Sequence, residues 1–230
     1  MYKASDIQIL HWHEAVRRRP EMYLGGKGPL SLRSMARRLF ECPLDPRRLK
    51  VVIESPRLEI FAACVPISVE PRKPDEPIYL VEVAGRPNPP LDDPPSIAGT
   101  DVQLIPPNLR TRNAGPMIIA ITNALSSEFK ITSYRTGVAT EARFSRGVLI
   151  SRPATTPSPA FEDGLSIAIT PDPEIFATHS FRFEDLAEEL RDFALRRRVD
   201  VELLDVASNA VFAMHCWRKN ENSALAGPSS

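Results

Sequence analysis

The stretch "TNALSSEFKITSYRTG", residues 122–137, decides the fold, because it joins the end of a buried helix to a strand at the edge of a sheet. Just before it, "GPMIIAITNALS" (115–126) places Ile118, Ile121 and Leu125 at helical spacing. Such an apolar stripe predicts a helix packed inside the protein. A buried helix that runs straight into a sheet is typical of an α+β domain.

Helical spacing of apolar residues and the alternation typical of strands predict the other elements. Helices are predicted over residues 5–17, 30–41 and 182–197, and strands over 49–55, 57–65, 78–83, 128–134, 141–147, 165–170, 199–206 and 210–217. Residues 21–29 are predicted to form a turn after Pro20. Proline clusters at 86–107 and 153–159 predict long loops, because proline removes a backbone donor and disfavours helix before it. We predict one domain over residues 1–218 and a disordered tail over 219–230.

Composition gives no general attraction to nucleic acid or membrane, since 29 basic side chains balance 29 acidic ones. Residues 1–50 are locally basic, with eleven basic and five acidic side chains, which favours a solvated surface over a polyanion contact. Cys42, Cys64 and Cys216 are not spaced as a metal site, so no metal is predicted. The sequence predicts a cytoplasmic protein for three reasons. The cysteines fit a reducing compartment, no signal pattern is found, and no apolar run reaches about 20 residues.

Four patches together carry a family resemblance. The segment "IQILHWHEAVRRRPEMYLGG" (7–26) resembles the opening of the N-terminal ATPase domain of the DNA gyrase B subunit and its topoisomerase IV counterpart. The stretch 122–137 resembles that family's Val-Val-Asn-Ala-Leu-Ser helix end and following strand. "ITPDPEIF" (169–176) and "FRFEDLAEELRDFAL" (181–195) resemble its later turn and helix. The resemblance implies a two-layer sandwich of the GHKL ATPase type, a mixed sheet covered by helices on one face.

The resemblance also implies where the ATPase chemistry would lie. The family's second helix carries a glutamate that activates water and, one turn later, an asparagine that holds magnesium. Alignment of "SLRSMARRLFECPLD" (31–45) with Gly-Leu-His-His-x-x-x-Glu-x-x-Asp-Asn-Ala-x-Asp predicts Arg38 at the base and Cys42 at the metal ligand. Arginine cannot act as a base near neutral pH, and a thiol is a poor magnesium ligand. A register shifted by three would place Glu41 at the base instead.

The family's adenine turn, Asp-x-Gly-x-Gly, and its glycine-rich phosphate lid are both altered. In "RLEIFAACVPIS" (57–68) an alanine is predicted at the aspartate, with a cysteine and a proline at the glycines. In "RNAGPMIIAITNALS" (112–126) one glycine remains, followed by proline, and an isoleucine fills a glycine position. The positions predicted to be degenerate are Ala63, Cys64, Pro66, Gly115, Pro116 and Ile118.

These losses predict a catalytically degenerate, gyrase-B-like protein that needs neither ATP nor magnesium and is not an enzyme. We expect it to act through protein interaction, with a type II topoisomerase subunit as candidate partner, and to be a monomer or a weak homodimer. The edge of the hairpin at 210–217 is one candidate dimer surface. Ala63, Cys64, Ile118 and the second helix should close over the old pocket. The alternatives are an ATPase with an unconventional pocket and a nucleic-acid-binding module that uses the basic N-terminal segment.

Overall fold

The computed structural model describes residues 12–42, 46–64, 115–159, 162–178 and 180–216. The predicted strand at 78–83, the loop at 86–107 and the tail at 219–230 lie outside these ranges. The helices are α1 (Trp12–Arg18), α2 (Pro20–Leu24), α3 (Pro29–Phe40), α4 (Gly115–Ala124) and α5 (Phe183–Arg197). The strands are β1 (Arg48–Glu54), β2 (Arg57–Ala63), β3 (Ser126–Arg135), β4 (Val138–Ser145), β5 (Val148–Pro157), β6 (Gly164–Pro171), β7 (Asp200–Asp205) and β8 (Ala210–Met214).

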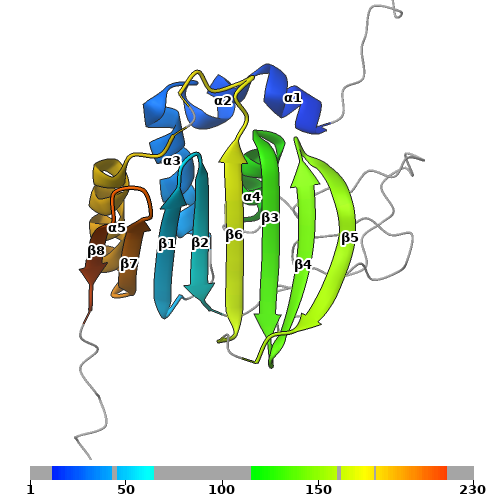
Figure 1. Cartoon of the computed structure of the whole chain (residues 1–230). Helices are drawn as coiled ribbons and strands as arrows, with labels where there is room; N and C mark the ends of the chain where they lie inside the picture. The colour runs from blue at the N-terminus through cyan, green and yellow to red at the C-terminus, as the bar shows by residue number, and fades with distance from the viewer. Residues whose placement is uncertain (1–11, 43–45, 65–114, 160–161, 179, 217–230) are drawn as a thin grey trace, which may run out of the picture.

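The strands form one sheet in the order β5-β4-β3-β6-β2-β1-β7-β8. Strands β1 and β7 are parallel, and the other neighbours are antiparallel. Helices α3, α4 and α5 lie behind the sheet in Figure 1, while α1 and α2 lie across its upper end. The predicted α+β sandwich with a mixed sheet covered on one face is confirmed. In the described ranges no helix is long and apolar enough to cross a membrane.

The core lies between the helices and the sheet face that they cover. In β1 every second residue is buried, namely Leu49, Val51 and Ile53. Because side chains alternate along a strand, these three lie on the face that the helices cover. Strand β2 continues this layer with Leu58 and Ile60. Each such side chain contributes about 1.5–3 kcal/mol when it is fully buried.

Two predicted loops are regular structure instead. Pro20 does not lead into a turn: it begins α2, because proline's fixed φ suits the first turn of a helix, and Gly25 in the left-handed region ends that helix. Pro153 and Pro157 lie within β5, which among the described strands pairs with β4 alone. Proline is tolerated there because an outer strand leaves one row of N–H groups unused. Its pairing also extends β4 back to Val138 from the predicted start at 141.

The junction between α4 and β3 is held from three directions. The last carbonyls of a helix have no donors inside the helix, so other groups must supply them. The donors are Arg17 Nη1 for Ala124 (3.0 Å), the N–H of Asp172 for Leu125 (3.0 Å) and the N–H of Arg146 for Ser126 (2.8 Å). Residues that are far apart in the sequence therefore meet where residues 122–137 pass from helix to strand.

A buried carboxylate stabilises the same junction. Asp172 Oδ2 lies 2.8 Å from Arg17 Nη1 and 3.0 Å from Arg146 Nε, and its side chain is 0% exposed. The N–H of Glu174 donates to Asp172 Oδ1 at 3.0 Å. Burial alone would raise the pKa of Asp172, but this hydrogen bond and the two guanidinium groups lower it below 3.8. Asp172 is therefore a carboxylate that links α1, β6 and the turn after β4.

Candidate functional site

The first part of the candidate site is helix α3, which carries the position predicted for the base. Arg38 is exposed, and its Nη1 donates to the carbonyl oxygen of Tyr23 in α2 at 2.8 Å. It points away from the sheet because it lies on the solvent side of an amphipathic helix. Glu41, the alternative base, is also exposed and lies 3.3 Å from Arg196. Neither side chain faces the layer where a nucleotide would have to bind.

Two pairs of residues in α3 have the required spacing of four positions, Met35 with Leu39 and Ala36 with Phe40, and all four are 0% exposed. Ala36 and Phe40 align with the family's base and metal ligand if its Gly-Leu pair is matched to Pro29-Leu30, two residues earlier than in the predicted alignment. The sequence holds no signal that selects this register, because Leu30 and Leu32 match the family's leucine equally well. In that register Ala36 would take the position of the base, which was predicted at Arg38, and Phe40 would take that of the metal ligand, which was predicted at Cys42.

Strand β2 supplies the second part of the site. Ala62 belongs to the core layer with Leu58 and Ile60, whereas Ala63 points to the opposite face, because side chains alternate along a strand. Ala62 also lies two residues before Cys64, as the spacing Asp-x-Gly requires. The motif spacing and the direction of the side chain both favour Ala62 for the adenine position, in place of the predicted Ala63. Cys64 is buried, and Pro66 lies outside the described residues.

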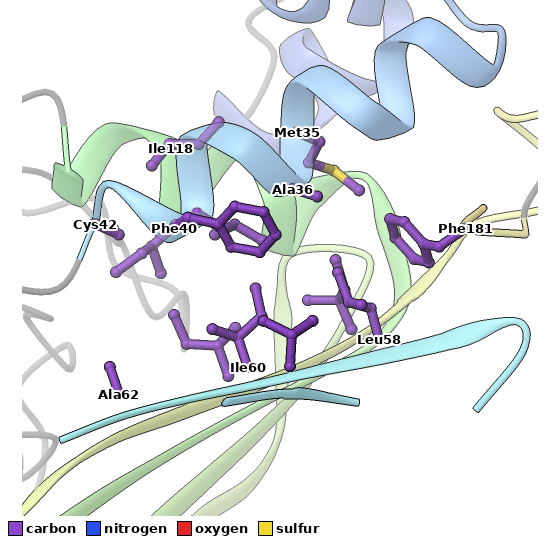
Figure 2. Close-up of a cluster of buried hydrophobic side chains, with 14 of the residues drawn as sticks. Met35, Ala36, Phe40, Cys42, Leu58, Ile60, Ala62, Ile118 and Phe181 are labelled. Atoms are coloured by element: carbon purple, nitrogen blue, oxygen red, sulfur yellow. The ribbon is translucent and has the colours of Figure 1, made fainter. Parts of the chain in front are cut away.

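The start of α4 supplies the third part. The helix begins at Gly115 and includes Pro116, and Ile118 is 5% exposed within the same core cluster as Phe40 and Ala62. Figure 2 shows Phe40 and Ile60 in the layer between α3 and β2, with Ile118 at the level of the helices. The structure thus brings the revised positions from three separate elements together, and each carries an apolar side chain.

The two thiols at this site are poor candidates for chemistry. Burial raises the pKa of Cys42 well above its ordinary range, with a further contribution from Cys64. Burial also raises the pKa of Cys64 to about 11, partly offset by a backbone hydrogen bond and by Arg47. Both thiols are therefore protonated at neutral pH, whereas the thiolate is the nucleophile and the metal ligand. The described residues contain no group of three or more His, Cys, Asp or Glu that could hold a metal.

A small cavity lies elsewhere, at the N-terminal end of α3. Its volume is about 10 Å³, which is room for about one water molecule. The lining includes Pro29, Leu32, Arg33, Phe181, Asp185 and Leu186. This cavity is too small for a nucleotide and does not include the residues of the candidate site.

No protein-family model matches the chain. The chain is 27% identical over 222 residues to the B subunit of DNA topoisomerase 4 from Mycoplasma capricolum, covering 90% of this chain and 32% of that protein. It is 28% identical over 215 residues to the B subunit of DNA gyrase from Treponema pallidum, covering 89% of this chain and 32% of that protein. The chain thus spans about a third of the length of these curated relatives.

A solved structure shares the fold. The 43K ATPase domain of Thermus thermophilus gyrase B, in complex with an aminocoumarin, superimposes with a TM-score of 0.68 at 20% identity. The match covers 88% of this chain and 51% of that one. The implied gyrase-B-type ATPase fold is therefore confirmed.

Proposed function

We propose that this chain, a relative of the B subunits of DNA gyrase and topoisomerase IV, keeps their ATPase-domain fold but neither binds nor hydrolyses ATP. One observation supports this proposal: Ala36, Phe40, Ala62 and Ile118 are all at most 5% exposed in one apolar cluster. In the revised register, these positions correspond to the family's base, metal ligand, adenine acceptor and phosphate loop. None of the four side chains can accept a proton, bind magnesium or accept a hydrogen bond.

The energetics also argue against a nucleotide in this layer. Its phosphates would have to displace buried side chains such as Phe40, whose removal from a core costs about 3–5 kcal/mol. The charges would then lie among apolar groups, where unpaired charge costs several kcal/mol per ion. Compensation would need carboxylate, amide or backbone donors that the described side chains of this cluster do not supply.

A protein that retains the ATPase-domain fold but lacks its nucleotide-binding side chains can still bind other proteins through its surface. The curated relatives are each named as one subunit of an enzyme, and subunits act through interfaces. We therefore propose a type II topoisomerase subunit as the partner and a change in that enzyme's activity as the effect. The buried network around Asp172 supports a rigid scaffold for such a contact, because it fixes α1 to the sheet.

The nucleotide part is tested by thermal unfolding with and without ATP and magnesium. A ligand at 100 times its Kd adds about 2.7 kcal/mol to stability, which is an easily measured rise in Tm. We expect no rise at millimolar ATP, while a gyrase B ATPase domain in the same assay should show one. A clear rise for this chain would favour the alternative of an unconventional ATP pocket.

The partner part is tested separately with purified gyrase and topoisomerase IV. Increasing amounts of this chain should bind the B subunit saturably and change the rate of ATP-dependent supercoiling or relaxation. Heat-unfolded chain is the control for nonspecific effects. Absence of binding to both enzymes would overturn the choice of partner, whatever the ATP assay shows.

A further inference from the structure

The two outer strands of the sheet are built differently. Strand β8, "AVFAM", has neither a charge nor a proline, and its pairing with β7 is regular from Asp205↔Ala210 to Val201↔Met214. Strand β5 contains two prolines, and its register with β4 shifts at two points. Charges, prolines and bulges are the devices that keep an outer strand from pairing with another chain. In the described part of the chain, β5 has such devices and β8 does not.

Strand β8 is also held in place from one side. Phe212 lies under the guanidinium of Arg191 in α5, 5.4 Å from the ring centroid. Just beyond the strand, Cys216 Sγ donates to the carbonyl oxygen of Ala194 at 3.3 Å, and the Cys216 N–H donates to Asp200 Oδ1 at 2.8 Å. A strand fixed in this way loses little conformational entropy when it pairs with another strand.

We propose that β8 pairs antiparallel with β8 of a second copy, so that the sheet continues across a twofold axis. With the axis at Phe212, Ala210 of one copy faces Met214 of the other, and Val211 faces Ala213. Each pair is apolar, so no like charges meet across the new interface. The strand is therefore complementary to itself, which is what a twofold contact requires.

Helix α5 supplies charge complementarity at the same edge. Figure 1 shows α5 beside β7 and β8. The contact of Arg191 with Phe212 turns one face of the helix toward β8, and Glu184 shares that face because it lies two turns before Arg191. Acidic residues occupy the first turn and arginines the last. A twofold axis would place the two helices antiparallel, with the acidic first turn of one copy toward the arginines in the last turn of the other.

This contact does not depend on the proposed function, because it uses neither the nucleotide positions nor a topoisomerase. A charged peptide would find no oppositely charged side chain on β8 itself, whereas a second copy satisfies both the strand and the helix. We therefore expect a homodimer that forms equally with and without ATP.

The experiment compares two double variants that differ only at residue 211. Val211 is 62% exposed and Ala213 is exposed, so both positions accept long polar side chains without loss of core packing. Val211→Lys with Ala213→Lys places lysine against lysine across the twofold axis. Val211→Glu with Ala213→Lys places glutamate against lysine. The control is Ile150→Lys on β5, since Ile150 is also 62% exposed.

Light scattering over a range of protein concentrations measures the mass. Wild type, the Glu/Lys variant and the Ile150 control should reach twice the 25.6 kDa of one chain. The Lys/Lys variant should dissociate at least about tenfold more readily, as repulsion of about 1.4 kcal/mol would cause. Circular dichroism and Tm confirm that all variants fold. A wild type that stays monomeric at about 100 μM, or a dimer that the Lys/Lys variant does not weaken, would overturn the proposal.

Discussion

Asp172 shows how much of this structure depends on single polar contacts. Its carboxylate is 0% exposed and pairs with Arg17 and Arg146, which come from segments far apart in the sequence. Burial of a carboxylate is costly unless it is paired and hydrogen-bonded. The apolar core therefore does not by itself explain how α1 is held, because this ion pair carries part of that role.

Replacement of Asp172 by Asn should destabilise the fold by about 3 kcal/mol, because it leaves two arginines without their buried counter-ion. Urea unfolding measures the change. The control is Glu174→Gln: Glu174 contacts the same two arginines, but its side chain is 61% exposed, so the expected cost is below about 1 kcal/mol. Equal losses in the two variants would show that burial of Asp172 contributes nothing.

The same residue should make stability depend on pH. The folded pKa of Asp172 lies below the 3.8 of an ordinary aspartate, so the carboxylate stabilises the fold above that value. Its contribution is lost as pH falls through the folded pKa. The stability difference between wild type and Asp172→Asn should therefore shrink between about pH 5 and pH 2. A difference that stays constant over this range would contradict the assignment.

The thiols should differ in reactivity. Cys42 and Cys64 are buried with raised pKa values, and at pH 8 a thiol of pKa about 11 is ionised in only about one molecule in a thousand. Cys216 is partly exposed. Alkylation of the native protein, read by mass spectrometry, should modify Cys216 alone, and denaturant should release the other two. Rapid native labelling of Cys42 would show that the site opens.

At the scale of elements, much of the fold could be predicted from periodicity. Helix α5 and strands β1, β3 and β6 lie within two residues of their predicted bounds, because each has a clear apolar pattern. Strand β5 could not be predicted, since its prolines are tolerated only because no strand in the described sheet pairs with its outer side. That is a property of the assembled sheet and not of the local sequence.

The candidate site was predictable in kind but not in its exact residues. Loss of polar side chains at the nucleotide motifs could be seen in the sequence. Which residues face the sheet could not, because a shift of one or two positions moves a side chain to another face. Only the structure separates them: Arg38 is exposed, and Ala63, although as buried as Ala62, lies outside the core cluster that contains Ala62.

The packing of α3 against α5 has its own test. Arg33 Nε lies 2.7 Å from Glu189 Oε1, and its other nitrogens lie 3.1 Å from Glu188 and 3.9 Å from Asp185. Arg33→Ala should cost about 1–2 kcal/mol in urea unfolding, since hydrogen bonds to charged groups contribute about that much. Arg37→Ala, an exposed arginine on the same helix, should change stability by less than about 0.5 kcal/mol. Indistinguishable effects would mean that the α3–α5 ion pairs are worth no more than a surface charge.

For the whole molecule, the sheet order predicts a single unfolding transition. Strands β1 and β2, from the N-terminal half, lie between β6 and β7, from the C-terminal half. Neither half of the chain can therefore complete a sheet without the other. Scanning calorimetry should give one peak whose calorimetric and van't Hoff enthalpies agree. Two resolved peaks would instead indicate independently stable parts.

The same strand order has a consequence for biosynthesis. The hairpin of β1 and β2 is complete at Ala63, but its neighbours begin only at Gly164 for β6 and at Asp200 for β7. At about 5–20 residues per second, a ribosome needs about 5–20 s to make the intervening hundred residues. During that time the newly synthesised hairpin exposes its apolar face, and neither β1 nor β2 has its second neighbouring strand. We therefore expect the growing chain to bind chaperones during that interval, before the rest of the sheet has been made.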